Sequence, residues 1–347
     1  MGGYTRKSFP VGVNLKTARI LAEVANSSLS KATWQNYSVA VKHVQKCNQL
    51  YGSGIRFPFR ESDTYNYIGH LIQIGLSHGT IKAYLTAIKH KHMELGFEGT
   101  ALRPRLLDNI LRGKRNRRNQ DGMQKERLPI GRDRMMLIKR WLKANKFPME
   151  ERALLWLIAT WLFQGSFRIR EILAEAKGYF NEDTTLLAGS VSLKKIKVRG
   201  EEVESLVINV KAPKEAKGKN VNVELFANHG RCCPVRAYKM WLKWRGGRPL
   251  NQKPFFMRRN GSLATQEDVS KLLKDVFPEL TDGKSKQFLS VHSFRSGLPS
   301  EMAKQGYDDE QIRRQGRWAS EAFRSYIKLG RAERWTSQFD LARAMKC

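Results

Sequence analysis

One polar stretch, residues 119–128, divides the chain into two segments with different sequence patterns. Its sequence, NQDGMQKERL, contains a glycine and mostly polar residues, which is typical of a linker between domains. Before it, the regular segments have the apolar spacing of helices, whereas strand-like runs occur only after it. With 347 residues, 41% of them hydrophobic, the chain is long enough for two cores. We therefore expect an α+β protein with domains at residues 1–118 and 129–347.

The first segment predicts a compact helical bundle with basic faces. Apolar side chains recur at helical spacing over residues 15–25, 31–50, 61–74, 77–95 and 105–111. Ser27, Ser28 and Ser30 are candidate caps for the second of these helices. Lysines and arginines occupy the other face of the fourth helix and the run that follows the fifth. The cations that we expect to contact a polyanionic partner are Lys82, Lys89, Lys91, Lys114, Arg115, Arg117 and Arg118.

The second segment mixes helices with short strands. Helical spacing is found over residues 132–146, 149–164, 234–244, 265–277 and 291–346. Strand-like runs at 185–188, 190–198, 203–210 and 220–225 predict a small antiparallel sheet with hairpin turns, and 255–256 predicts one more short strand. We therefore expect a mainly helical second domain with a small sheet and a C-terminal tail helix.

The charge balance points to a polyanionic partner. The chain has 63 Lys and Arg against 32 Asp and Glu, which gives a formal net charge of +31. A chain this basic repels itself unless a polyanion neutralises it, and double-stranded DNA is the first candidate. A membrane surface is the second, but no apolar run reaches the roughly 18 residues that span a bilayer. Residues 1–16 also lack the apolar core of a signal peptide.

The sequence offers no pattern for a metal or a nucleotide cofactor. The four cysteines lack the spacing of a zinc site, so we expect reduced thiols in an intracellular protein. No group of acidic residues has ligand-like spacing, which argues against a two-metal nuclease. No glycine loop of the Walker type is present either. Any reaction of this chain is therefore expected to proceed without metal or ATP.

The residues with the most specific chemistry lie in the last sixty positions. His292 and Arg295 stand three apart, so on a helix they would share a face. A histidine can move a proton, and an arginine presents a permanent cation with a planar fork of donors. Tyr326 follows a Gly-Arg-Trp stretch at 316–318. A phenol ordinarily has a pKa of about 10, so it needs a base or a cationic field to attack at neutral pH. These groups together suit a metal-free attack of a tyrosine on a phosphodiester.

The motifs and their order resemble the tyrosine recombinase (phage integrase) family over nearly the whole chain. The Gly-x-x-Arg-x-x-Glu-Ile-Leu stretch at 165–173 is similar to the family's first arginine motif. The resemblance implies that Arg168 is the first catalytic arginine and Glu171 a supporting acid, while Arg170 stands where the family tolerates many residues. His292 and Arg295 match the family's His-x-x-Arg motif.

The same resemblance assigns the remaining site residues. The hairpin at 211–219 resembles the segment that carries the family's lysine, where Lys214 is the better match and Lys211 the alternative. Trp318 occupies the position of a later histidine or tryptophan and either donates to a phosphate oxygen or packs against the tyrosine. Tyr326 matches the nucleophile. The rival phenol, Tyr307, follows a glycine in an expected turn and lacks the preceding Gly-x-Trp.

The resemblance also implies an architecture and an activity. The helical first domain would be a core-binding domain, and the second the catalytic domain. The activity would be site-specific cleavage and rejoining of DNA through a 3′-phosphotyrosyl intermediate, by a tetramer on two duplexes or a dimer on one site. The Gly-Arg-Trp form is closest to recombinases of eukaryotic mobile elements such as Cryptons and DIRS-like retrotransposons, which implies integration or excision of an element.

Several alternatives stay open at this point. The chain could be a type IB topoisomerase or telomere resolvase, which share the active site, or a catalytically silent DNA-binding protein derived from a recombinase. A protein of a eukaryotic element would work in the nucleus, and otherwise in the cytoplasm or nucleoid. The apolar face of residues 332–345 is expected to dock on a neighbouring subunit or on its own domain.

Overall fold

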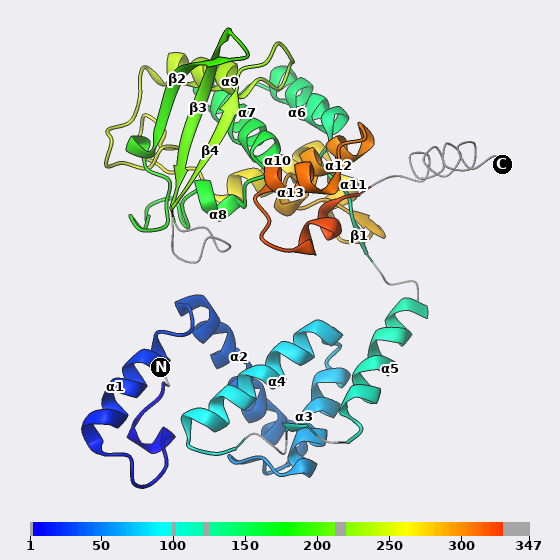
Figure 1. The fold of residues 1–347 in the computed structure, drawn as a ribbon. Helices are drawn as coiled ribbons and strands as arrows, with labels where there is room; N and C mark the ends of the chain where they lie inside the picture. Colours follow the sequence, from blue (N-terminus) through cyan, green and yellow to red (C-terminus); the bar gives the residue numbers. More distant parts are fainter. Residues whose placement is uncertain (1–2, 99–101, 104, 121–124, 212–219, 329–347) are drawn as a thin grey trace, which may run out of the picture. The chain divides into compact units, whose positions relative to one another are not determined.

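The computed structural model describes residues 3–98, 102–103, 105–120, 125–211 and 220–328. The chain divides into two compact units, residues 1–124 and 125–347, labelled along the ribbon in Figure 1. This division falls inside the stretch that we expected to be a linker. The expected linker is nonetheless partly regular, because α5 (Leu107–Gln120) extends into it and Glu126–Arg127 form strand β1.

Unit 1 is helical, as the apolar spacing predicted. After a short 3-10 turn η1 (Arg6–Ser8), its helices are α1 (Leu15–Asn26), α2 (Lys31–Tyr51), α3 (Glu61–Gln73), α4 (His78–Glu94) and α5. Ser30 and Ser77 cap α2 and α4 by accepting hydrogen bonds from the main-chain N–H groups of residues 33 and 80. Helix α5 runs through Gly113 to Gln120, so our expected end at residue 111 was wrong. The apolar faces of α2 to α5 meet in one core.

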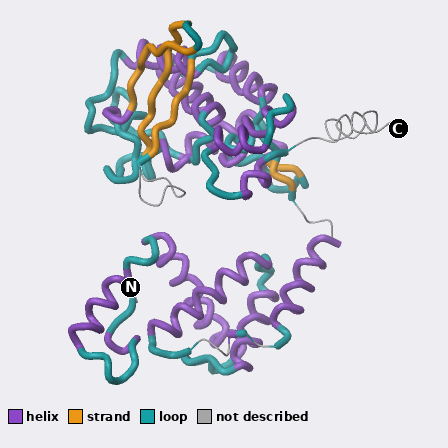
Figure 2. The backbone as a smooth tube through the Cα atoms, in the orientation of Figure 1, coloured by secondary structure: helices purple, strands orange, loops and turns teal. Residues whose placement is uncertain are grey.

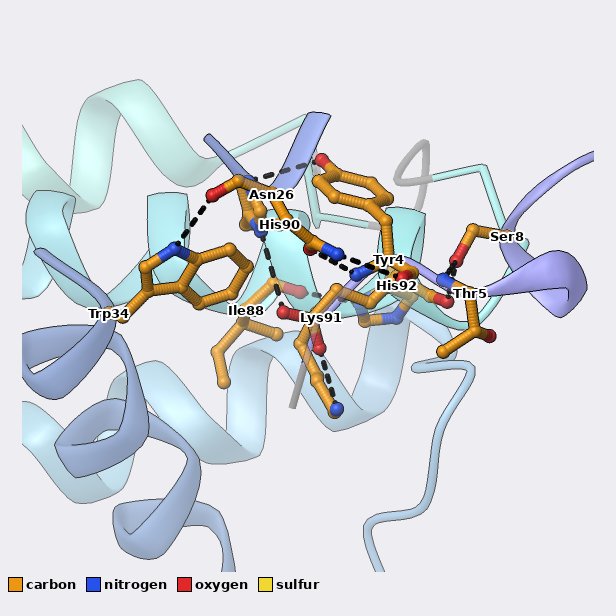
Figure 3. A network of polar contacts seen from close by, with 10 residues as sticks. Tyr4, Thr5, Ser8, Asn26, Trp34, Ile88, His90, Lys91 and His92 are labelled. Atoms are coloured by element: carbon orange, nitrogen blue, oxygen red, sulfur yellow. Dashed lines mark hydrogen bonds and ion pairs between the residues drawn. The ribbon is translucent and has the colours of Figure 1, made fainter. Parts of the chain in front are cut away.

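A polar network joins the N-terminal residues of unit 1 to α4 (Figure 3). His90 lies at its centre, with the rings of Tyr4, Trp34 and Tyr37 at centroid distances of 5.1, 5.1 and 5.3 Å. The hydroxyl of Tyr4 lies 3.1 Å from Nε2 of His90, and the side chain of Asn26 accepts from the Tyr4 main-chain N–H at 2.7 Å. These contacts order residues 4–8 against a helix more than eighty positions away.

Unit 2 is built around one helix that is buried over most of its length. Helix α7 (Met149–Gln164) is buried at every position from 153 to 163, and α6 and α9 pack on it. Trp161 of α7 stacks on Phe255 at 5.0 Å, and Trp241 of α9 contacts the same ring at 5.1 Å. The other helices of this unit are α6 (Arg132–Ala144), α8 (Ile169–Ile172), α9 (Pro234–Arg245), α10 (Gln266–Val276), α11 (Pro278–Thr281), α12 (Gly297–Lys304) and α13 (Asp309–Gly316).

A three-stranded antiparallel sheet completes the core of unit 2, seen as the orange strands of Figure 2. Its order is β2 (Val191–Val198), β3 (Glu201–Val210) and β4 (Val221–Phe226), with Val191 opposite Ile208 and Ile208 opposite Val223. Helix α9 packs on β3 and β4. Two expected strands were wrong: residues 185–188 contain a single bridge from Leu187 to Pro254, and residues 255–256 form a turn.

A second, two-stranded ladder was not expected. Strand β1 pairs in parallel with β5 (Gln287–Phe288), and the ladder continues as a hydrogen bond of 2.9 Å from the N–H of Ile130 to the carbonyl of Ser293. The beginning of unit 2 is thereby attached to the segment that carries His292 and Arg295. This attachment cannot be read from either stretch alone, since its partners are 161 positions apart.

The C-terminal part of the described chain alternates short helices with turns. The 3-10 helix η5 (Val291–Ser293) precedes α12 and α13, and the 3-10 helix η6 (Glu321–Tyr326) follows them. The expected tail helix lies in residues 329–347, outside the described residues. Within the described ranges, no helix is long and apolar enough to cross a membrane.

Candidate active site

A tight turn after α7 forms the floor of the site. Gly165 ends the helix, and Ser166 adopts a left-handed backbone with φ 45°, a conformation that is uncommon for residues other than glycine. Phe167 then turns into the core, and its ring lies where a Cβ atom on residue 165 would have to be. The turn leaves the carbonyl groups of Gly165 and Ser166 to accept hydrogen bonds from arginines of distant segments.

Arg168 and Glu171 are joined at the start of α8. Glu171 accepts from the main-chain N–H of Arg168 at 3.0 Å and from its Nη1 at 2.9 Å, so the carboxylate caps the helix and pairs with the guanidinium at once. The Glu171 side chain is 8% exposed, and that of Arg168 is 23% exposed. Arg170 is exposed on the other side of this short helix. The structure thus places the two expected residues together and the third away from them.

Arg295 is the most deeply buried cation of the site, with 1% exposure. Its Nη1 donates to the carbonyl of Ser166, and its Nη2 donates to that of Gly316 at 3.3 Å. Burial lowers the pKa of Arg295 to about 10, with a further contribution from the positive charge of Arg168. No carboxylate contacts the Arg295 guanidinium within the described part of the chain. A buried cation without a direct carboxylate contact is suited to receive an anion.

Two aromatic rings cover the Arg295 guanidinium. Its Cζ atom lies 4.8 Å from the ring centroid of Trp318 and 5.6 Å from that of Tyr326. The two rings contact each other at 5.2 Å, and Tyr326 is half-buried at the end of η6. The Trp318 indole N–H is buried without a hydrogen-bond partner among the described residues. Trp318 therefore packs against both the arginine and the tyrosine, and its indole N–H remains a free donor with respect to the described residues.

His292 lies beside this cluster but in different surroundings from Arg295. Residues 291–293 form a 3-10 turn rather than the α-helix assumed from the sequence, and His292 is exposed whereas Arg295 is buried. Partial screening of the imidazole from water is the largest cause of a lowered pKa for His292, and nearby positive charges lower that pKa further. These charges belong to Arg127, Arg295 and Arg168. A neutral imidazole at pH 7 can accept a proton.

The lysine of the expected set is not placed by the structure. Lys214 lies in residues 212–219, outside the described residues. The alternative, Lys211, stands directly after β3, and its Nζ donates to the carbonyl of Glu182. Tyr307, the rival phenol, is 47% exposed, and none of its described contacts reaches the arginine cluster.

Arg317 belongs to the cluster but was not among the expected site residues. Its Nη2 donates to the carbonyl of Gly165 at 3.1 Å and to Glu171 at 3.3 Å, and its Cζ atom lies 4.9 Å from the Phe167 ring centroid. The only sequence signal was its place inside the Gly-Arg-Trp stretch. There is no room for a side chain at Gly316, because the indole of Trp318 occupies that space.

The expected polyanion-binding cations of unit 1 lie on α4 and α5. Lys82, Lys89, Arg115 and Arg117 are exposed and Lys114 is half-buried, while the side chain of Arg118 lies outside the described residues. Lys91 is paired with Glu94 at 2.6 Å. Two further arginines join Lys82 and Lys89 around an open pocket of about 550 Å³; they are Arg103 and Arg105. The grouping is visible only in the structure, since Arg103 and Arg105 approach α4 through the fold.

No family model matches the sequence, and no curated protein matches it. Solved structures match its fold. A XerH site-specific recombinase, bound to a palindromic difH substrate after cleavage, is 14% identical with a TM-score of 0.59, covering 93% of this chain and 83% of the recombinase. The Tn1549 transposon integrase bound to transposon right end DNA is 13% identical with a TM-score of 0.55, covering 91% of this chain and 95% of the integrase.

A third similar structure is a lambda integrase dimer bound to a COC′ core site. It is 14% identical with a TM-score of 0.52, and the match covers 90% of this chain and 94% of the integrase. All three matches include both units. A mainly helical chain with one small antiparallel sheet, similar over nine-tenths of its length to these proteins, therefore shares its fold with these site-specific recombinases and integrases.

Proposed function

We propose that this chain cleaves and rejoins double-stranded DNA through a covalent tyrosyl intermediate. The observation that carries this proposal is the contact between the half-buried Tyr326 ring and the buried Arg295 guanidinium, whose Cζ lies 5.6 Å from the ring centroid and which no carboxylate of the described residues contacts. A tyrosine beside a cation without a direct carboxylate contact suits attack on a phosphate. The shared fold and the net charge of +31 support DNA as the source of that phosphate.

The cleavage step needs a proton acceptor, a proton donor and charge stabilisation. The phenolic oxygen of Tyr326 forms a bond to phosphorus as the bond from phosphorus to the 5′ oxygen breaks, and its proton passes to neutral His292. The 5′ oxygen leaves as a hydroxyl with a proton from Lys214 or Lys211. Arg168 and Arg295 stabilise the additional charge on the non-bridging oxygens. Attack of a 5′ hydroxyl on the phosphotyrosine reverses the step, so rejoining needs no ATP.

The assembly and the biological setting are parts of the same proposal. We expect a tetramer on two duplexes, made by the tail helix of residues 332–345 docking on a neighbouring subunit, and action in integration or excision of a mobile element. Truncation after Gly330 should leave DNA binding by the monomer but abolish DNA-bound oligomers, measured by native electrophoresis and light scattering. Oligomers that survive the truncation would contradict docking in trans.

The decisive experiment traps the intermediate. A nicked suicide DNA substrate, which loses its short 5′ product, should leave the wild-type chain covalently attached in denaturing electrophoresis. Tyr326→Phe removes one hydroxyl and should abolish the adduct while DNA affinity stays within about twofold, and Tyr307→Phe is the matched control. An adduct that persists in Tyr326→Phe and disappears in Tyr307→Phe would overturn the assignment.

The same experiment separates the alternatives. Sequencing of the trapped DNA ends identifies the cleaved site. Strand transfer between two duplexes would indicate a recombinase, whereas relaxation of supercoiled DNA without transfer would indicate a topoisomerase. Specific binding with no adduct from any substrate would indicate a silent DNA-binding protein.

A further inference from the structure

Glu171 carries a negative charge into a site that is proposed to bind an anion. Its carboxylate is 8% exposed and lies 2.9 Å from Nη1 of Arg168, so it offsets part of the positive charge that Arg168 offers to a phosphate. This offset matters most in the transition state, because attack of a phenolate raises the charge of a phosphodiester from about −1 to about −2. The site therefore needs a cation that compensates the carboxylate itself.

Arg317 stands where such a cation is required. Its Nη2 lies 3.3 Å from Oε2 of Glu171, the oxygen that also caps α8, whereas Arg168 Nη1 contacts Oε1, and the Gly165 carbonyl and the Phe167 ring fix the position of Arg317. The Glu171 carboxylate is thus held between two guanidinium groups, that of Arg168 three positions before it and that of Arg317, 146 positions after it. Charge-assisted contacts of this kind are stronger than neutral hydrogen bonds and fix the geometry of both partners.

Capping of α13 does not explain an arginine at this position. Arg317 ends the helix with φ 58°, a left-handed conformation that glycine or asparagine adopts at lower cost. Its Nε is buried without a partner among the described residues, and burial lowers its pKa. Both features make the position costly for an arginine, so the side chain must serve a purpose besides the helix end.

We propose that Arg317 is a positioning residue that compensates the charge of Glu171, so that Arg168 keeps its full positive charge for the scissile phosphate. This inference rests on the proposed DNA cleavage and adds a third arginine to the site. It makes two predictions that a purely structural role does not make. Loss of the Arg317 charge should be corrected by loss of the Glu171 charge, and it should matter less when the phosphate itself carries less charge.

A double-mutant cycle tests the first prediction. In single-turnover adduct formation on the suicide substrate, Arg317→Gln should be slower than the wild type by about 10²-fold. Adding Glu171→Gln, which keeps an acceptor for the α8 cap, should recover at least tenfold of that loss. Arg314→Gln is the matched control: Arg314 lies on the same helix, is 77% exposed and pairs with Glu310, so its rate should stay near that of the wild type.

A methylphosphonate at the scissile position tests the second prediction. This group lacks one charged oxygen. The factor by which Arg317→Gln slows adduct formation should therefore be at least tenfold smaller on the methylphosphonate than on the phosphodiester. Arg317→Lys keeps the charge and should resemble the wild type in the ratio of the two rates, which keeps the test valid if Arg317→Gln folds poorly. Equal losses on both substrates, or a double variant no faster than Arg317→Gln, would overturn the inference.

Thermal unfolding distinguishes failure of this inference from failure of the proposed function. A wild-type chain that forms no adduct would refute DNA cleavage but leave the pairing of Arg317 with Glu171 measurable. Arg317→Gln should lower Tm more than the double variant does, because it leaves a buried carboxylate with one cation fewer. Additive changes in Tm would refute the compensation whether or not the chain cleaves DNA.

Discussion

Replacement of Arg295 by methionine should abolish adduct formation with little change in stability. Burial lowers the pKa of Arg295 from the ordinary value of an arginine to about 10. Because the pKa is lower in the folded chain than in the unfolded one, the charged group destabilises the fold at every pH well below 10, and the penalty declines only as the pH rises above 10. At about 1.4 kcal/mol per unit, the penalty at neutral pH is about 3 kcal/mol.

Methionine removes this penalty and keeps most of the apolar stem. The variant in turn leaves the carbonyl groups of Ser166 and Gly316 without their donor, at a cost of about 1–3 kcal/mol each. With about 1.5 kcal/mol for each carbonyl the two effects nearly cancel, so the free energy of unfolding should change by less than about 2 kcal/mol, or about 4–8 °C in Tm for a unit of this size. The adduct rate should fall by at least about 10²-fold, because the lost cation is one of those facing the phosphate.

Arg258 provides the matched control in the same unit. It is also mostly buried, but Glu151 accepts from it at 2.6 and 2.7 Å and raises its pKa. Arg258→Met therefore leaves a partly buried carboxylate unpaired and should cost about 3 kcal/mol or more. Differential scanning calorimetry and the adduct assay measure both quantities. If Arg295→Met lowers Tm as much as Arg258→Met, or keeps the adduct, Arg295 is a structural residue and the reasoning is refuted.

Three further outcomes are expected. If about eight phosphates are contacted, the slope of log K against log salt in fluorescence anisotropy should be about −7, and a slope near zero would contradict phosphate-dominated binding. Lys214→Ala should regain cleavage when the 5′ leaving oxygen is replaced by sulfur, since a thiolate leaves without a proton. If Lys211→Ala regains cleavage instead, Lys211 is the proton donor. Burial is the largest cause of the lowered pKa values of His43, His70, His90 and His92, all in unit 1. The fold therefore favours the neutral form of these histidines. Their contribution to the stability of unit 1 is complete above about pH 6.5, the ordinary pKa of a histidine, and is lost as the pH falls and the side chains take up protons. Hydrogen exchange should show unit 1 opening before unit 2 below pH 6, and the reverse order would contradict this.

Much of the helical fold could be predicted because local signals agreed with one another. Ser30 caps α2 as expected, and apolar periodicity located α3, α4 and α7 within about two residues of their ends. The end of α5 was wrong because the apolar spacing stops at residue 111, whereas the helix continues through Gly113 to Gln120. Glycine inside a helix costs only about 1 kcal/mol, and no neighbouring atom crowds this position.

Other errors arose because hydrophobicity predicts burial and leaves the backbone conformation open. Phe255 and Phe256 are buried as their composition suggests, but they stack on Trp161 and Trp241 from a turn. The meeting of Arg168, Arg295 and Tyr326 in one site was expected from a resemblance, and the structure brings them together. The resemblance did not identify Arg317 as a site residue, because its contact with the site depends on a left-handed backbone at residue 317 and on Glu171, 146 positions earlier.

Strand β1 determines where mechanical load enters the second unit. Chain tension arriving from residue 124 meets main-chain hydrogen bonds from Glu126 to Lys286, from Leu128 to Phe288 and from Ile130 to Ser293. A parallel ladder pulled along its length shares such a load among its bonds instead of opening one at a time. The last of these bonds ends at Ser293, so tension carried by β1 is passed directly to the stretch that holds His292 and Arg295.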